Sequence, residues 1–368
     1  MQRGASVLEV GLIVSIVSYA AIGAKVPLGI LAERVGKWPV IPAALLGQSL
    51  SLLLYSLASS PIWFYPVRVF HALILAAFAP TAIAMASDLA PSGKRGDMIG
   101  RFLTSFGAAT MLGPFICSFL LGYLDYVRIF QLAAVFPLLG FTIFLPSIRR
   151  GSRRSYLKRI GISEAGRFSP LGSLKKIVAS REVLILSYLR LTFSFTNAFF
   201  ITIFPLYASQ SLLLSSSLIA ILFGVKGVTN MVFRLPSGKI SDRIGRRTPL
   251  FLSYLLLALT YLIISESKDF YVLSLAMAIY GLAHGMRAVT EWALLGDSIP
   301  SEVSGVASAY LSTMFNVGGA LGATASGALS LILPTSSIFK IASLIVFPGA
   351  FVPFLTRKKS FQLHANEG

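Results

Sequence analysis

The sequence has little of several things that soluble enzymes use. Its 368 residues include one cysteine, Cys117, which excludes a disulfide framework and a cysteine-based metal site. Charged residues make up 12% of the chain, against about 25% in ordinary soluble domains. No phosphate-binding Gly-x-x-x-x-Gly-Lys-Ser/Thr element and no grouping of a nucleophile with a base is present. We therefore expect no enzyme, no ATP-driven pump, no metal and no cofactor.

Long apolar stretches are the dominant feature of what is there. Hydrophobic residues make up 55% of the chain, and the mean hydropathy is +0.78. Stretches such as 39–58 and 332–355 reach the roughly 20 residues that a helix needs to cross a bilayer. Together with helix breakers and charges, these stretches predict an all-α integral membrane protein with eleven transmembrane helices. The lipid bilayer is thus the first expected partner.

The net charge of +18 arises from 32 Lys and Arg residues against 14 Asp and Glu residues. The basic residues lie in short clusters after alternate apolar segments, not on one face or arm as in nucleic-acid-binding proteins. Because Lys and Arg accumulate in cytoplasmic loops, these clusters predict topology and not nucleic-acid binding. The last cluster, at 357–359, places the C-terminus in the cytoplasm of a multi-pass plasma-membrane protein.

The two halves of the chain repeat one pattern. Residues 25–29 and 33–37 read Lys-Val-Pro-Leu-Gly and Glu-Arg-Val-Gly-Lys, and they recur at 234–238 and 242–246 as Arg-Leu-Pro-Ser-Gly and Asp-Arg-Ile-Gly-Arg. The offset is 209 residues. Later pairs keep it: Asp88 with Asp297, Pro91 with Pro300, Gly96 with Gly305 and Gly113 with Gly322. Two equivalent bundles are typical of secondary transporters, because such bundles can rock about a site between them.

The repeat also predicts the domain boundaries. Residues 1–148 form an N-terminal bundle, 183–357 form a C-terminal bundle, and a basic cytoplasmic linker, 149–182, separates them. Residues 358–368 form a cytoplasmic tail. The basic residues of the linker fit the orientation rule, and a switch that binds anionic lipid headgroups is the alternative interpretation.

The repeat has one unmatched helix. The second half opens with an apolar segment at about 183–208, whose counterpart would precede Met1. The chain therefore gives five helices plus six from a twelve-helix pattern. A start codon placed too late or a truncated gene would explain this arrangement, and a natural eleven-helix protein is the alternative.

The segment 238–247, Gly-Lys-Ile-Ser-Asp-Arg-Ile-Gly-Arg-Arg, resembles the loop signature of the major facilitator superfamily, and 29–37 resembles its first-half copy. Glu33 stands where that family usually has Asp. The resemblance implies the fold of that family, with our bundles equivalent to helices two to six and seven to twelve, and a loop that gates the cytoplasmic side. The residues that carry the gating prediction are Gly29, Glu33, Arg34, Gly36, Lys37, Gly238, Asp242, Arg243, Gly245 and Arg246.

Each acidic residue of this loop lies at the C-terminal end of a helix, where the partial negative charge of the macrodipole opposes a carboxylate. Glu33 and Asp242 therefore each need a partner. Candidate partners are Arg34, Arg243, Arg101 or the N-terminus of a helix from the other half. Orientation charges and glycine turns alone would explain the arginines but not the acids.

Polar and ionisable residues within the predicted spans mark a candidate pathway for solute or protons, since such groups are costly in a bilayer. They are Arg68, His71, Arg190, Asn197, Lys226, His284, Arg287 and Glu291. Spacings of three and four residues put His284, Arg287 and Glu291 on one helix face, where Arg287 and Glu291 are suited to an ion pair. Structural pairing and substrate contact remain equal alternatives there. The excess of basic groups indicates an anionic solute, or carboxylates on a helix outside the sequence.

These observations predict a monomeric secondary transporter that moves a small solute by alternating access, as a proton-coupled efflux antiporter. His71, His284 and Glu291 are the candidate titrating groups. Gly113 and Pro114 resemble the Gly-Pro element of proton-coupled drug exporters, although the glycine pair expected after it is absent. The alternatives are an uptake carrier for an organic anion, and a receptor or inactive remnant that transports nothing.

Overall fold

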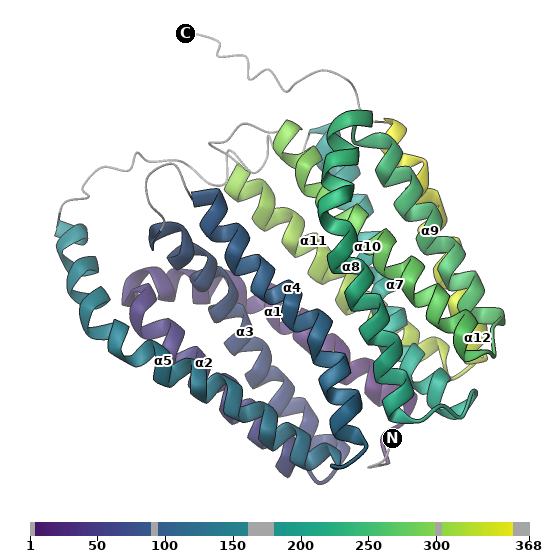
Figure 1. The fold of residues 1–368 in the computed structure, drawn as a ribbon, viewed down its shortest axis with the longest axis horizontal. Coiled ribbons are helices and arrows are strands. Elements are labelled where there is room, and N and C mark those ends of the chain that lie inside the picture. Colours follow the sequence, from purple (N-terminus) through teal and green to yellow (C-terminus); the bar gives the residue numbers. More distant parts are fainter. Residues whose placement is uncertain (1–3, 90–94, 161–179, 299–303, 356–368) are drawn as a thin grey trace. The chain divides into compact units, whose positions relative to one another are not determined.

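The computed structural model describes residues 4–89, 95–160, 180–298 and 304–355, and every regular element in these ranges is a helix (Figure 1). The chain divides into two compact units, Met1–Arg167 and Phe168–Gly368. The division falls inside the predicted linker, 149–182. The predicted tail, 358–368, lies outside the described residues.

A helix occupies each of the eleven predicted segments. Within the described ranges, nine helices are long and apolar enough to cross a membrane, and α4 contains a shorter apolar helix, Gly107–Leu121. Helices suit a bilayer because each satisfies its own backbone hydrogen bonds where water is absent. The multi-pass helical architecture is confirmed, while the count of eleven crossings stays a prediction.

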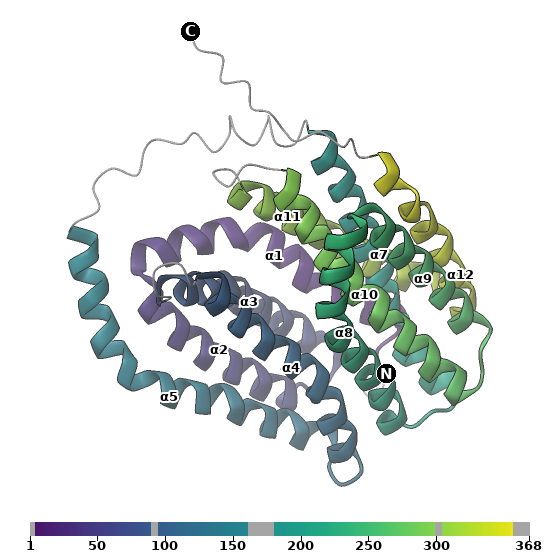
Figure 2. The same cartoon turned by 45° about the horizontal axis from the view of Figure 1, so that its top comes forward.

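The first unit consists of α1 (Val7–Val35), α2 (Lys37–Leu57), α3 (Pro61–Leu89), α4 (Arg95–Leu121) and α5 (Tyr126–Ile160). Helix α2 packs against both α3 and α5, while α1 and α4 pack against α3 (Figures 1 and 2). Between α2 and α5 the Ser49 hydroxyl donates to the carbonyl oxygen of Ala134 over 2.8 Å. The rings of Trp38 and Phe144 stack with centroids 5.5 Å apart. Helix α5 ends at Ile160, so it continues into the segment predicted as a linker.

The second unit consists of α7 (Arg181–Gln210), α8 (Ser216–Ile244), α9 (Arg247–Glu266), α10 (Phe270–Ser298), α11 (Ser304–Leu329) and α12 (Thr335–Val346). Two short 3-10 helices, Phe347–Ala350 and Val352–Leu355, follow α12, and each contains a proline that removes a helical N–H donor. Helix α7 packs against α11 and α12, and α10 packs against α8 and α9. Ser180 and Ser215 cap α7 and α8 by accepting from the backbone N–H of Val183 and Leu218.

The helix bounds reproduce the repeat. Helices α1 and α3 begin and end 209 residues before α8 and α10, so Val7–Val35 matches Ser216–Ile244 and Pro61–Leu89 matches Phe270–Ser298. The first helix of each matched set ends at a glycine in the left-handed region, Gly36 with φ of 96° and Gly245 with φ of 86°. Only glycine adopts this backbone without strain, so both halves turn out of the helix in the same way. Helix α7 has no matching helix among the described residues of the first unit.

Glycines bring the site-bearing helices into close backbone contact. A Cβ atom at Gly322 or Gly318 of α11 would collide with the backbone of α7 at Phe195 or Leu191. A Cβ atom at Gly281 of α10 would likewise collide with the backbone of α8 at Lys226. Small residues are the usual means of such close approach in membranes.

We predict that Gly322→Ala destabilises the protein, because the Phe195 backbone cannot retreat from the new methyl group. Overpacking of this kind costs about 1–3 kcal/mol. Gly113→Ala is the matched control, since Gly113 is the repeat-equivalent residue and nothing lies within 4 Å of a Cβ atom there. Thermal unfolding in detergent should show a lower midpoint for Gly322→Ala only. Equal midpoints for the two variants would contradict the close α7–α11 contact.

Candidate functional site

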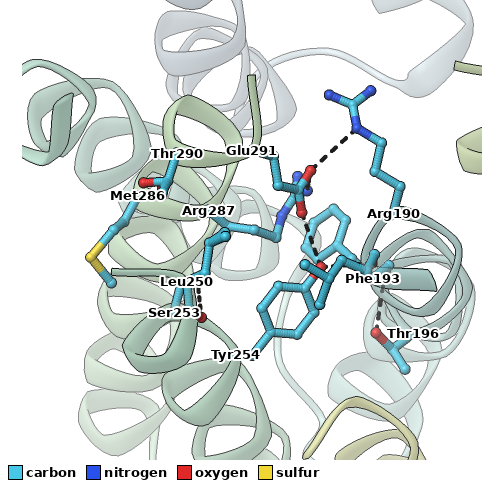
Figure 3. Close-up of polar contacts among 11 residues, drawn as sticks. Arg190, Phe193, Thr196, Leu250, Ser253, Tyr254, Met286, Arg287, Thr290 and Glu291 are labelled. Carbon is cyan, nitrogen blue, oxygen red and sulfur yellow. Dashed lines mark hydrogen bonds and ion pairs between the residues drawn. The ribbon is translucent and has the colours of Figure 1, made fainter. Parts of the chain in front are cut away.

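The core of the second unit contains a buried charged cluster that joins α7, α9 and α10. Arg287 and Glu291 lie one turn apart on α10, and the Arg287 guanidinium is 2.6 Å from Oε2 of Glu291. Arg190 of α7 reaches the same oxygen, with its Nε 3.3 Å away (Figure 3). The exposed fractions are 6% for Arg190, 4% for Arg287 and 1% for Glu291. The predicted Arg287–Glu291 ion pair is therefore present, and Arg190 joins it.

Tyr254 of α9 completes the cluster and was not predicted. Its hydroxyl lies 2.6 Å from the carbonyl oxygen of Leu189 and 3.0 Å from Oε1 of Glu291 (Figure 3). A tyrosine hydroxyl has one proton to donate, so it cannot donate fully to both oxygens at once. Which oxygen receives that proton depends on whether Glu291 itself carries a proton.

Aromatic faces cover both arginines. The guanidinium carbon of Arg287 lies 3.5 Å from the centre of the Phe193 ring, and that of Arg190 lies 3.9 Å from the centre of the Trp292 ring. Such contacts stabilise a cation by about 0.5–2 kcal/mol and also exclude water. Two cations are thus held against one carboxylate, and the cluster as a whole has an excess of positive charge.

A second group of predicted residues lies around Lys226 of α8. Its amino nitrogen is 4.5 Å from the centres of both the Phe200 and Tyr280 rings. The Tyr280 hydroxyl donates to Oδ1 of Asn197 over 2.8 Å and lies 3.2 Å from the hydroxyl of Tyr261. Asn197 therefore positions a ring of the site through a side-chain hydrogen bond.

His284 connects these two groups. Its ring lies 4.9 Å from that of Phe193, which also contacts Arg287, and 6.3 Å from that of Tyr280, which also contacts Lys226. The buried Nδ1 atom of His284 has no hydrogen-bond partner among the described residues. The structure thus brings Arg190, Asn197, Lys226, His284, Arg287 and Glu291 into one connected set.

The other two pathway candidates form a separate cluster in the first unit. The Arg68 Nε donates to the carbonyl oxygen of Ile13 over 3.3 Å, and its NH1 lies 3.4 Å from the Tyr55 hydroxyl. His71 is held between Tyr55, 3.1 Å from its Nδ1, and Gln48, 3.0 Å from its Nε2. Both nitrogens of His71 are therefore engaged, and Tyr55 and Gln48 are members of this cluster that sequence reasoning missed.

The predicted gating loop of the second unit holds an ion-pair triad. Arg246 pairs with Asp242 in its own loop, and its Nε is 2.7 Å from Oδ2 of Asp297 at the end of α10. The hydrogen bond with Asp297 is the main cause that raises the pKa of Arg246, and burial opposes it. Asp242 thus pairs with Arg246, which was not among the candidate partners, and the candidate Arg243 is exposed.

The remaining loop residues are placed as follows. Gly245 and Gly36 supply the left-handed turns described above, Lys37 begins α2, and Gly238 lies in α8 against Val289 of α10. Gly29, Glu33 and Arg34 lie in α1, and the structure does not describe the side chains of Glu33 and Arg34. By sequence, Glu33, Lys37 and Asp88 are the 209-residue counterparts of Asp242, Arg246 and Asp297.

The sequence and the fold were compared with those of known proteins. The family profile described as Major Facilitator Superfamily matches residues 2–211 and 184–367. An uncharacterised MFS-type transporter of Methanocaldococcus jannaschii is 21% identical over 352 residues, which cover 96% of this chain and 90% of that protein. The multi-drug resistance efflux pump PmrA of Streptococcus pneumoniae is 26% identical over 352 residues, 91% of this chain and 83% of the pump.

Two further similarities agree with these. The multidrug resistance protein MdtG of Salmonella paratyphi C is 24% identical over 326 residues, 86% of this chain and 78% of that protein. A crystal structure of a bacterial homologue of the human lysosomal transporter Spinster, inward-facing and occupied, matches with a TM-score of 0.76 at 14% identity. The match covers 96% of this chain and 90% of that one, and it establishes the fold.

We predict that Glu291→Ala strongly destabilises the second unit, because it leaves Arg190 and Arg287 buried without a counter-ion. Breaking a buried pair by removing one partner costs about 3–5 kcal/mol. Replacing both Arg287 and Glu291 by Met should restore part of the loss. Thermal unfolding in detergent measures these effects.

The matched control is Glu266→Ala. Glu266 pairs with Lys340 at a distance of 2.7 Å, but both side chains are exposed, so its removal should change the unfolding midpoint little. A Glu291→Ala midpoint no lower than that of Glu266→Ala would show that the buried cluster does not hold the helices together.

Proposed function

Because the chain belongs to the Major Facilitator Superfamily, and is therefore a multi-pass membrane transporter, we propose that it expels a small solute from the cell in exchange for protons. A carrier that expels a solute from the cell must lie in the plasma membrane, and we propose a cytoplasmic C-terminus from the distribution of Lys and Arg along the chain.

Two relatives support the direction. PmrA of Streptococcus pneumoniae is named as a multi-drug resistance efflux pump, and MdtG of Salmonella paratyphi C as a multidrug resistance protein. Both align over more than four fifths of this chain. Similarity over that length includes both bundles, so it extends to the helices that carry the buried cluster.

The proton site is proposed from the surroundings of Glu291, the single acidic residue among the buried residues that the structure describes. When Glu291 is ionised, it is the counter-ion of Arg190 and Arg287, and the Tyr254 proton is best directed at it. When Glu291 is protonated, it can donate to the Tyr254 oxygen, and Tyr254 then donates to Leu189 of α7. Protonation would thus change which groups link α7, α9 and α10, as a coupled carrier requires.

The two histidines remain weaker candidates for coupling. His71 has both nitrogens engaged within the first unit, and His284 lies among positive charges. Neither is the counter-ion of a buried cation. A change of charge on Glu291 disturbs two ion pairs at once, so we assign the coupling proton to Glu291 and not to a histidine.

Uptake of an organic anion is a second candidate, and the charge balance of the site favours it. Protonation of Glu291 would leave two buried arginines without a counter-ion, and an anionic solute that arrives with the proton would replace it. Proton and anion would then move in the same direction. A receptor or inactive remnant would move neither proton nor solute.

Proton flux into proteoliposomes distinguishes these functions. Vesicles holding the purified chain and a trapped pH-sensitive dye start without a pH gradient, and a charged aromatic probe, phenyltrimethylammonium or benzenesulfonate, is added outside. Exchange should make the lumen more alkaline as the probe enters. Cotransport should make the lumen more acidic, and a remnant should leave it unchanged.

For either coupled function we predict that Glu291→Gln abolishes probe-dependent proton flux while radiolabelled probe still equilibrates across the membrane. The amide keeps the shape of the side chain but cannot gain or lose the proton. Because it also leaves Arg190 and Arg287 without a counter-ion, flux is measured below the unfolding midpoint of the variant. Glu266→Gln, at an exposed acidic residue of the same unit, is the control and should retain flux. Undiminished proton flux in Glu291→Gln would refute the assignment of the coupling site.

A further inference from the structure

Lys226 differs from the other cations of the buried set because it has no anion beside it. Arg190 and Arg287 both pair with Glu291, whereas no described acidic residue forms an ion pair with Lys226. Its amino group instead lies over rings, those of Phe200 and Tyr280 at 4.5 Å and that of Phe223 at 5.8 Å. Ring faces stabilise a desolvated ammonium by about 2 kcal/mol, so they offset only part of the several kcal/mol that loss of water costs a buried ion.

The rings around Lys226 are fixed in place. Phe200 stacks on Tyr280 with centroids 4.8 Å apart, and it contacts Phe223 at 5.5 Å. The Tyr280 hydroxyl is hydrogen-bonded to Asn197 of α7. Helices α7, α8 and α10 therefore hold the amino group at a defined position, which is what a recognition site for a charged group requires.

The charges around Lys226 and His284 favour an anionic ligand over a cationic one. Two cations surround His284 through shared rings, because Phe193 contacts both Arg287 and His284, and Tyr280 contacts both Lys226 and His284. The one buried carboxylate described, Glu291, is already occupied by two arginines and Tyr254. A cation entering this region would meet like charges, and an anion would meet opposite ones.

Burial and ion pairing indicate which of these cations can contact a bound anion. Arg190 and Arg287 are buried and paired, so a solute would have to break the Glu291 cluster to reach them. Lys226 is half-buried and unpaired. The buried Nδ1 of His284, in the same connected set, also lacks a hydrogen-bond partner among the described residues.

We infer that Lys226 anchors a binding site for a small organic monoanion, a carboxylate or sulfonate on an aromatic or apolar body. The ammonium pairs with the anionic group, and the surrounding aromatic side chains offer apolar contact to the body. This inference rests on the proposed transport function and names the class of solute. It holds for either direction of transport.

The test is equilibrium binding to the purified full-length chain in detergent, measured by calorimetry with three probes that share one ring. Benzenesulfonate is the anion, benzenesulfonamide the neutral analogue and phenyltrimethylammonium the cation. We expect benzenesulfonate to bind at least tenfold more tightly than either other probe. The inference would be overturned if phenyltrimethylammonium bound more tightly than benzenesulfonate, or if benzenesulfonamide bound as tightly as benzenesulfonate. This test needs only the unmodified protein.

Variants assign the site to one residue. Lys226→Met should weaken benzenesulfonate binding at least tenfold, and Lys226→Arg, which keeps the charge, should retain most of it. Lys340→Met is the matched control, because Lys340 is an exposed lysine of the same unit that pairs with Glu266. Unchanged affinity in Lys226→Met, or equal loss in Lys340→Met, would overturn the assignment. If Lys226→Met does not fold, Lys226→Arg decides the assignment. A folded Lys226→Arg variant that no longer binds benzenesulfonate also overturns it.

The binding result and the transport result can fail separately. Benzenesulfonate that binds through Lys226 but moves no protons in proteoliposomes leaves the anion site standing and refutes the coupled function. Proton flux driven by phenyltrimethylammonium, with no binding of benzenesulfonate, refutes the anion site and leaves the coupled function standing.

Discussion

A carboxylate buried away from water must be neutralised, and this requirement organises the second unit. Glu291 of α10 can lie in the core only because Arg287 and Arg190 balance its charge and Tyr254 supplies a hydroxyl. These partners come from α7, α9 and α10, so the charge ties together three helices that apolar packing alone would hold less specifically. Glycines add close backbone contacts around these helices, between α10 and α8 and between α11 and α7.

The same need for a counter-ion links the charges of the second unit to proton and anion binding. A cluster with two arginines and one acid is balanced only while the acid is ionised, so a proton on Glu291 creates a demand for another anion. Lys226, held against rings without an anion, has that demand already. At the helix ends, Arg246 has its counter-ions, because it pairs with both Asp242 and Asp297. Paired charges thus stabilise one arrangement, and unpaired or protonatable ones respond to what is bound.

Much of the fold could be predicted from the sequence, because apolar length and repeated motifs determine it. The offset of 209 residues between Gly29 and Gly238 predicts the bounds of α8 and α10 from those of α1 and α3. The ion pair of Arg287 and Glu291 followed from their spacing of four residues on one helix. Helix α5 runs to Ile160, beyond the predicted start of the linker, because basic composition indicates a cytoplasmic location but does not end a helix.

The rest of the site depends on tertiary contacts that spacing does not encode. Arg190 is about 100 residues from Glu291 in the chain, and Tyr254 and Tyr280 resemble any other aromatic residue of a transmembrane helix until the helices are packed. Gln48 and Tyr55 were missed beside His71 for the same reason. The partner of Asp242 is a different case: Arg246 lies four residues away, but α8 ends at Ile244 and Gly245 turns the chain, so helical spacing does not predict this pair.

The central proposal is that Glu291, which lies between two arginines, takes up the coupling proton. Infrared difference spectroscopy of the purified chain, between alkaline and acidic buffer, detects the carbonyl stretch of a protonated carboxyl group directly. Exposed carboxyl groups give such bands in both proteins, so we predict one additional component on acidification of the unmodified chain that is missing from Glu291→Gln. Identical difference spectra for the two proteins would contradict the assignment.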